Sequence, residues 1–254
     1  MCASNRLHPT IAYTHIKETK MFRFQQFTVH DDRCAMKVGT DGVLLGAWTN
    51  ASEAQKAVDI GTGCGLVALM LAQRYPTLQI TAVEIDAEAA AQAAENVEES
   101  PFNGQITVVA DDAIRFAAHE LSESYDLVVS NPPFFQESLL PPDATRATAR
   151  HTAAGLGFGQ LADIAVTLLR PGGRLAVIIP KNAESTFHDI CNRHGLSLLH
   201  TTDIRTVAHK PVRRILMCFH KGAPPETVVR DDIILMYEGQ RSESYARLCR
   251  DFYL

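Results

Sequence analysis

The sequence predicts an α/β fold in which helices cover both faces of a doubly wound, mostly parallel sheet. An apolar strand that ends near residue 60 leads into a glycine-rich turn and then into residues 66–74, which have helical periodicity. Further apolar runs at residues 79–83 and 125–130 predict two more strands. Strands that alternate with helices are typical of Rossmann-like sheets, which bind ligands at the carboxyl ends of their strands.

The other elements follow in chain order. Residues 22–29 alternate like one short strand, and a helix begins near Gly42, with Thr40 or Asp41 as its candidate cap. The apolar patterns further along predict helices at residues 88–98, 161–169 and 188–194, a turn at 171–173, and strands at 106–109, 174–179, 196–199 and 214–219.

Length and composition agree with one domain. A chain of 254 residues with 46% hydrophobic content can bury a sizeable core. Residues 1–20 lack apolar periodicity, so we expect a mobile extension there and a single domain over residues 21–254. No apolar run is long enough to span a membrane and no signal peptide is evident, so we expect a cytoplasmic protein. Neither the six cysteines nor the ten histidines show metal-ligand spacing, so no metal is predicted.

Asn131-Pro132-Pro133-Phe134 is the most informative segment for chemistry. Two consecutive prolines end the preceding strand and present Asn131 at its carboxyl end. The Asn131 side-chain oxygen and the Pro132 carbonyl can both accept hydrogen bonds from one planar amino group, as found on adenine or on a glutamine amide. The ring of Phe134 offers a face for stacking. Asn131, Pro132 and Phe134 are therefore the candidate catalytic residues. The alternative is a proline-rich turn that only ends a strand.

The glycine turn favours the catalytic interpretation. Gly61, Gly63 and Gly65 allow a ligand to approach the backbone closely at a helix N-terminus. Glu84 follows 19 residues after Gly65, which is the spacing of an acidic residue that binds ribose hydroxyls. Dinucleotide enzymes share this arrangement but usually have Gly-x-Gly-x-x-Gly. The tighter spacing, preceded by Asp59, suits a smaller ligand without phosphate, and S-adenosylmethionine fits best.

Residues 31–48, the glycine turn and residues 130–134 together resemble the bacterial tRNA1(Val) adenine-N6 methyltransferase family, which belongs to the class I S-adenosylmethionine-dependent methyltransferases. The resemblance runs from about residue 22 to the C-terminal residues. It implies methyl transfer to N6 of adenine 37 in tRNA, contact with the anticodon loop, and an antiparallel hairpin at the C-terminal edge of the sheet. Many members have Tyr where this chain has Phe134.

The same resemblance implies a set of cofactor-binding residues, with Asp111 as the close competitor of Asp112 for the adenine of the cofactor. The full set comprises Thr40, Asp59, Gly61, Gly63, Gly65, Glu84, Asp112 and Asn131. Cys64 is not needed as a nucleophile, because a nitrogen atom attacks the methyl group directly.

RNA contacts are predicted from basic residues. Residues 136–159 read as a long loop in which Arg146, Arg150 and His151 are candidate phosphate contacts beside Phe134. The net charge of −5 excludes a general polyanion binder, but residues 205–221 contain five Lys or Arg and no acidic residue. We therefore expect a local patch facing RNA, or alternatively an ordinary solvated sheet edge.

Two other functions remain open at this stage. A protein-glutamine N5-methyltransferase acting on release factors would use the same Asn-Pro-Pro grip, although such enzymes normally carry an additional N-terminal helical domain, and only about 50 residues precede Asp59. A non-catalytic S-adenosylmethionine-binding protein would not need Asn131. No obligate protein partner is inferred.

Overall fold

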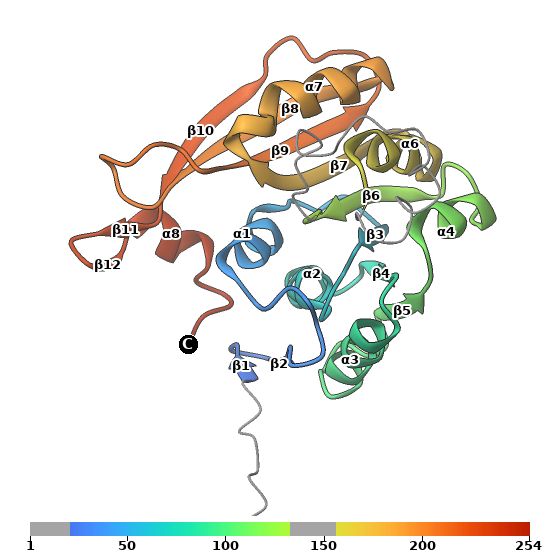
Figure 1. Ribbon diagram of the computed structural model, residues 1–254, viewed down its shortest axis with the longest axis horizontal. Coiled ribbons are helices and arrows are strands. Elements are labelled where there is room, and N and C mark those ends of the chain that lie inside the picture. The colour runs from blue at the N-terminus through green and yellow to red at the C-terminus, as the bar shows by residue number, and fades with distance from the viewer. Residues whose placement is uncertain (1–20, 133–155) are drawn as a thin grey trace, which may run out of the picture.

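The structure, a computed structural model, describes residues 21–132 and 156–254. Its centre is an eight-stranded sheet with the order β10-β8-β9-β7-β6-β3-β4-β5 (Figure 1). The strands of this sheet are β3 (Lys56–Ile60), β4 (Gln79–Glu84), β5 (Ile106–Ala110), β6 (Tyr125–Ser130), β7 (Leu169–Pro180), β8 (Leu196–Arg205), β9 (Arg214–Lys221) and β10 (Val229–Ile234).

The direction of winding reverses between β3 and β6. From β3 the chain proceeds outward through β4 and β5, then returns to the other side of β3 and continues through β6 and β7, all in parallel pairs. The carboxyl ends of β3 and β6 therefore lie side by side, which is where ligands bind in doubly wound sheets. The predicted fold class is confirmed.

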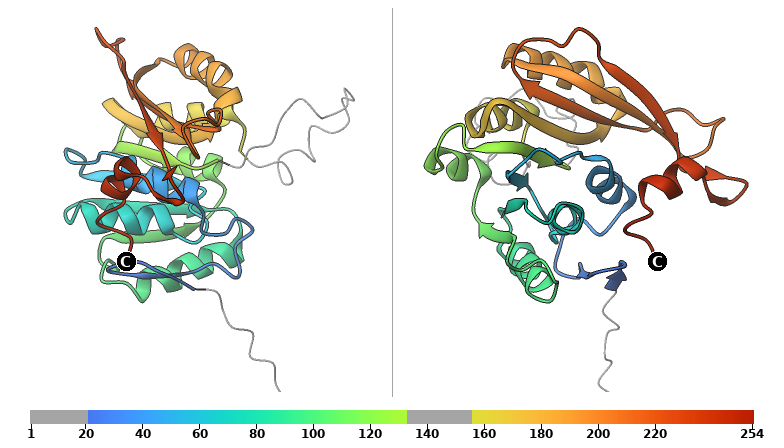
Figure 2. Two further views of the ribbon diagram at one scale, coloured as in Figure 1. Left: turned by 90° about the vertical axis from the view of Figure 1, so that its left-hand side faces the viewer. Right: turned by 180° about the vertical axis from the view of Figure 1, so that it is seen from behind.

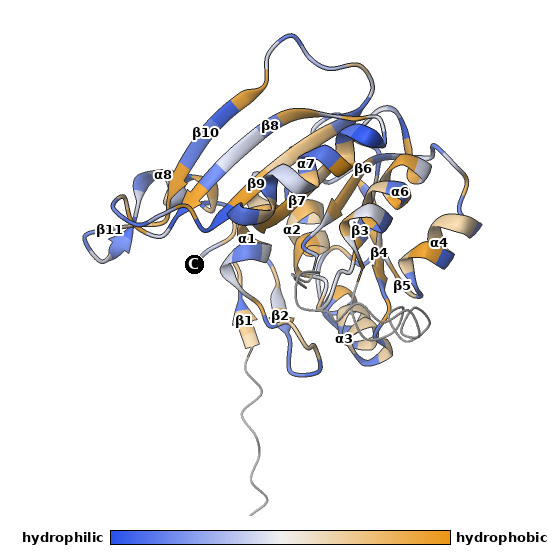
Figure 3. Cartoon of the chain, turned by 45° about the horizontal axis from the view of Figure 1, so that its top comes forward, coloured by the Kyte–Doolittle hydropathy of each residue, from blue (hydrophilic) through white to orange (hydrophobic). Residues whose placement is uncertain are grey.

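Helices cover both faces of the sheet because its strands are apolar on both sides. Along β3, Ala57 belongs to one buried cluster, whereas Val58 and Ile60 belong to the other. The first cluster packs against α1 (Thr40–Trp48), α2 (Leu66–Arg74) and α3 (Ala87–Glu98), and the second against α4 (Ala113–His119), α6 (Phe158–Leu168) and α7 (Glu184–Arg193). Figure 3 shows the hydrophobic residues concentrated in the central strands.

The C-terminal part of the sheet contains the expected antiparallel pair, together with one strand that we did not predict. β9 pairs antiparallel with both β7 and β8. Beyond β8, β10 pairs parallel with it and forms the outer edge. Charged and exposed residues at 230–232 run along β10 and show as hydrophilic in Figure 3. Charges on an edge strand hinder pairing with other chains.

The N-terminal segment is a hairpin, so the prediction of one strand over residues 22–29 is wrong. β1 (Met21–Arg23) pairs antiparallel with β2 (Thr28–His30). Between them, the backbone N–H of Phe24 donates to the carbonyl of Phe27 at 2.8 Å, and the two buried rings stack with centroids 4.7 Å apart. Burial of both rings in one tight turn explains the alternating pattern without a continuous strand.

One further local prediction is wrong. Thr40 and Asp41 do not cap α1, because the capping position is Gly39 and both residues lie in the first turn of the helix. Asp41 instead accepts a hydrogen bond from Nε of Arg214 at 2.7 Å. The turn predicted at residues 171–173 appears as a bulge within β7: Leu169 pairs with Tyr125 and Arg174 with Leu127, so the residues between them have no partner in β6, and Gly172 has a φ of +80°.

The C-terminal segment returns to the N-terminal hairpin after β11 (Met236–Tyr237), β12 (Gln240–Arg241) and α8 (Glu243–Leu248) (Figure 2). The backbone N–H of Gln25 donates to the carbonyl of Phe252 at 2.9 Å, and its side-chain amide donates to the carbonyls of Arg250 and Tyr253. Phe252 is fully buried, with the Arg74 guanidinium 4.6 Å above its ring. Across residues 21–132 and 156–254, no helix is long and apolar enough to cross a membrane.

Candidate active site at the switch point of the sheet

A cavity of about 660 Å³ opens at the carboxyl ends of β3, β4, β5 and β6. This volume lies within the range of about 300–1,000 Å³ that is usual for small-molecule sites. Of the predicted cofactor residues, only Gly65 does not line the cavity. Those that do are Thr40, Asp59, Gly61, Gly63, Glu84, Asp112 and Asn131, together with Pro132 from the catalytic set.

The glycine turn keeps one wall of the cavity open. Gly61 and Gly63 have φ angles of +71° and +58°, in the left-handed region, and a Cβ atom built on either would meet nothing within 4 Å. Gly65 is also left-handed, but it lies against α3, since a Cβ there would contact Ala93 at 3.5 Å. Gly65 therefore faces the protein interior, whereas Gly61 and Gly63 leave the backbone accessible to a ligand.

Glu84 connects the end of β4 to the glycine turn. Its carboxylate accepts one hydrogen bond from the backbone N–H of Gly63 at 2.8 Å and another from the backbone N–H of Asp86 at 3.0 Å. These bonds hold both oxygens at the cavity wall, and each oxygen retains a lone pair for a further donor. The arrangement is suited to a pair of hydroxyl groups.

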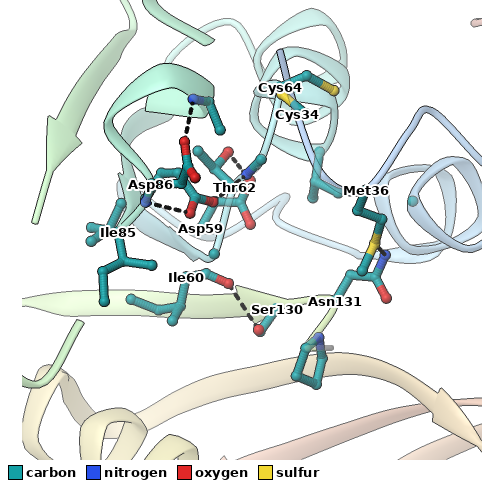
Figure 4. Close-up of a pocket in the computed structure, with 18 of the residues that line it drawn as sticks. Cys34, Met36, Asp59, Ile60, Thr62, Cys64, Ile85, Asp86, Ser130 and Asn131 are labelled. Atoms are coloured by element: carbon teal, nitrogen blue, oxygen red, sulfur yellow. Dashed lines mark hydrogen bonds between the residues drawn. The ribbon is translucent and has the colours of Figure 1, made fainter. Parts of the chain in front are cut away.

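Asp59 is a buried acid below the turn. It is 2% exposed, and its carboxylate accepts a hydrogen bond from the Thr62 hydroxyl at 2.6 Å (Figure 4). Burial raises the pKa of Asp59 to about 7, with a smaller contribution from the negative charge of Glu84. A cation in the cavity would compensate this buried charge.

Asp111 and Asp112 follow β5, and their carboxylates differ in whether an oxygen remains free to accept a hydrogen bond. Oδ1 of Asp112 caps α4 by accepting from the backbone N–H groups of Ile114 and Arg115, and its Oδ2 has no hydrogen bond within the described residues. Asp111 pairs with the Arg115 side chain and accepts from the Asp112 backbone. Asp112 is thus both a helix cap and a cavity-lining acceptor.

Asn131 lies at the end of β6, where the Ser130 hydroxyl donates to the Ile60 carbonyl at 2.8 Å and joins β6 to β3. The Asn131 amide nitrogen donates to the sulfur of Met36 at 3.6 Å (Figure 4). Its Oδ1 is buried and has no partner among the described residues. A buried acceptor without a donor costs about 1–3 kcal/mol, so this oxygen is suited to a donor on a ligand. We did not predict a role for Met36.

Two buried amides on α3 hold the segment that closes the cavity. The Asn96 amide donates to the carbonyls of His30 and Cys64 at 2.8 and 2.9 Å, and its oxygen accepts from the backbone N–H of His30. One turn earlier, Gln92 accepts from the backbone N–H of Arg33 and donates to Asp32 at 2.6 Å. We did not predict this role, although two amides at i and i+4 on an otherwise alanine-rich helix face are a sequence signal for it.

Cys34 and Cys64 lie together in the lining of the cavity (Figure 4). Both are buried. The pKa of Cys64 is raised by its hydrogen bond to Cys34 and by burial. A thiol with a raised pKa stays protonated and is a poor nucleophile. No group of three potential metal ligands occurs in the described ranges.

Four residues that were predicted to contact RNA lie outside the described residues. These are Phe134, Arg146, Arg150 and His151.

The local RNA-facing patch expected from residues 205–221 stays a prediction, and not all of its basic residues share one surface. β9 carries Arg214 and Lys221 to opposite edges of the sheet, about 23 Å apart for seven steps of strand. Lys221 is bound to Glu123 and Arg214 to Asp41.

Comparison with known proteins agrees with this geometry. The family described as "Methyltransferase small domain" matches residues 36–193. A protein from Bacteroides fragilis named tRNA1(Val) (adenine(37)-N6)-methyltransferase is 44% identical over 245 residues, covering 92% of this chain and 97% of the relative. One of the same name from Serratia proteamaculans is 42% identical and covers 92% and 89%.

The fold is also found among solved structures. A crystal structure of a predicted O-methyltransferase from Agrobacterium tumefaciens superimposes with a TM-score of 0.67 at 20% identity, covering 84% of this chain and 96% of that one. At this identity the likeness concerns the fold alone. The relatives match nearly the full chain at 42–44% identity. The chain therefore belongs to the tRNA1(Val) (adenine(37)-N6)-methyltransferase family of class I methyltransferases.

Proposed function

We propose that this protein transfers a methyl group from S-adenosylmethionine to N6 of adenine 37 in tRNA1(Val). The names of relatives that match over 92% of the chain support this substrate. The observation that carries the chemistry is Oδ1 of Asn131, a buried acceptor without a partner in the described residues, at the wall of a cavity large enough for a nucleoside.

The cavity-lining residues fit the groups of the proposed cofactor. Glu84 would accept hydrogen bonds from the two ribose hydroxyls, since its carboxylate is already oriented by two backbone donors. The buried charge of Asp59 favours the cationic amino-acid part, which would lie over Gly61 and Gly63. Oδ2 of Asp112 would accept from the adenine amino group.

Asn131 and Pro132 would orient the target. The target amino group would donate one hydrogen bond to the Asn131 side-chain oxygen and one to the Pro132 carbonyl. This orientation favours a nitrogen lone pair that points at the methyl group. The sulfonium of the cofactor supplies an electrophilic methyl group. The aminium product is strongly acidic, so its proton is lost without a dedicated strong base. Proximity and alignment supply most of the rate enhancement in this scheme.

A specific observation favours adenine over a glutamine amide. The near full-length relatives carry adenine in their names. Because Asn131 has the geometry for an amino group, a purely cofactor-binding role leaves its unpartnered oxygen unexplained.

The test is methylation of defined RNA by the purified protein. Transcribed tRNA1(Val) is incubated with isotopically labelled S-adenosylmethionine, and nucleosides and RNase fragments are examined by mass spectrometry. We expect N6-methyladenosine in the fragment that contains position 37, and none in a transcript with guanine at that position. Label in the guanine variant would contradict the proposed position. Label in a release-factor glutamine, with none in tRNA, would contradict the proposed substrate.

A further inference from the structure

The loop between β8 and β9, residues 206–213, projects from the same edge of the sheet as Asn131. The register pairs Arg214 with Pro180, the last residue of β7, and with Ile204 near the end of β8. β9 is two strands away from β6, and β8 is three. At about 4.8 Å per strand, the loop is displaced sideways by roughly 10–15 Å. Because Ser130 pairs with Val177 and Arg214 with Pro180, three residues further on, the loop also begins about 10 Å beyond the end of β6, which gives roughly 14–18 Å in all.

The base of this loop is attached to the cavity wall. Nε of Arg214 bonds to the Asp41 carboxylate at 2.7 Å, and Asp41 lines the cavity. The backbone N–H of Lys181 donates to the carbonyl of Arg213, and the backbone N–H of Arg213 donates to the carbonyl of Ile204 at 3.1 Å. A turn closes further out, where the backbone N–H of Lys210 donates to the carbonyl of Val207. The loop therefore has a defined position relative to the site.

The loop carries cations that its neighbours do not neutralise. Around it, Lys181 is paired with Asp203, and Arg205 with Asp232. Lys210 and Arg213 are exposed, and neither has a carboxylate within ion-pair distance in the described parts of the chain. Residues 206–213 include no acidic residue, although the whole chain has a net charge of −5. The loop is thus a local positive surface on an acidic protein.

We propose that Lys210 and Arg213 contact RNA phosphates on the substrate strand near the methylated base. This inference rests on the proposed function. One strand of a nucleic-acid helix carries a phosphate about every 3.4 Å of rise, so a reach of about 14–18 Å corresponds to about four to five nucleotides. Exposed Lys and Arg side chains bind phosphates without reading sequence. The loop would hold the anticodon arm in place while Asn131 binds the target amino group.

The experiment compares two double variants that remove the same charge. Lys210→Ala/Arg213→Ala removes the proposed contacts. Lys56→Ala/Arg193→Ala removes two exposed cations at the opposite edge, since Lys56 begins β3 and Arg193 ends α7. Binding of tRNA1(Val) to each protein is measured by fluorescence anisotropy over a series of salt concentrations. Binding of S-adenosylmethionine, measured by calorimetry, verifies that each variant is folded.

Two lost phosphate contacts should reduce the slope of log K against log salt by about 1.4–1.8. If the parent and the loop variant bind tRNA equally at about 1 M salt, the shallower slope makes the variant bind roughly 25- to 60-fold more weakly at about 0.1 M salt. The opposite-edge variant should keep the parent slope, and Lys210→Arg should keep it as well. An unchanged slope in the loop variant, or an equal change in both double variants, overturns the inference. A parent protein that binds tRNA but does not methylate position 37 would instead refute the proposed function.

Discussion

Replacing Asp59 by Asn should stabilise the free protein, by an amount that depends on pH. The Asp59 pKa is raised from 3.8 to about 7 by burial. Between these values the folded protein binds a proton that the unfolded chain has lost, so the free energy of unfolding falls as pH rises. The stability contributed by protonated Asp59 is complete below pH 3.8 and is lost as pH rises to about 7.

The magnitude follows from the shift. Each pKa unit corresponds to about 1.36 kcal/mol, so a shift of about three units corresponds to about 4 kcal/mol in total, and about 3 kcal/mol of it falls between about pH 5 and pH 7. An Asn side chain at this position would not titrate, and its oxygen can still accept from the Thr62 hydroxyl. The stability of the variant relative to the parent should therefore increase by about 3 kcal/mol from about pH 5 to about pH 8.

Urea unfolding of both ligand-free proteins at the two pH values measures this difference. Calorimetric titration at the higher pH should show weaker binding of S-adenosylmethionine by the variant, because the buried negative charge that favours its cationic end is gone. If the stability difference between Asp59→Asn and the parent is the same at both pH values, the raised pKa is refuted. Unchanged cofactor affinity would remove Asp59 from the binding site.

Three other substitutions test the site. Asn131→Ala should lower kcat by roughly 100-fold or more with cofactor affinity nearly unchanged, measured by single-turnover methylation and calorimetry; turnover within a few-fold of the parent would exclude the proposed role. Glu84→Gln should weaken S-adenosylmethionine binding by roughly 10- to 100-fold, since a charged acceptor is worth about 1.5–3 kcal/mol, and equal affinity in a titration would contradict its contact with ribose. Asn96→Ala leaves three backbone groups without their partner, so we expect about 2–4 kcal/mol lower stability in urea together with weaker cofactor binding; a loss of under about 0.5 kcal/mol would show that these bonds are dispensable.

The parts of the fold that could be predicted depend on residues adjacent in the chain. The glycine turn, the acid after β4 and the proline pair after β6 each follow an apolar strand directly, so they end up together once the strands are parallel. The prediction that Asn131 and Glu84 lie at the same edge of the sheet rests on this arrangement of the strand ends.

The parts that could not be predicted depend on partners far away in sequence or on packing that periodicity does not record. The stacking of Phe24 on Phe27 replaces a strand with a turn. The middle of β10, residues 230–232, is charged, so its own sequence does not read as a strand, and it pairs with the edge that β8 offers. The role of Met36 depends on the proximity of Asn131, a residue 95 positions away. Local periodicity contains no information about such contacts.

The contact between Gln25 and Phe252 also joins segments that are translated at different times. All eight strands of the main sheet have left the ribosome before Phe252 does, because β10 ends at Ile234. The hairpin of β1 and β2 is translated before these strands, yet the backbone N–H of Gln25 gains its partner only after Phe252 has emerged. The segment that follows this hairpin closes the cavity. In a nascent chain that has not yet reached Phe252, the sheet can therefore form before the hairpin beside this segment has its C-terminal contacts.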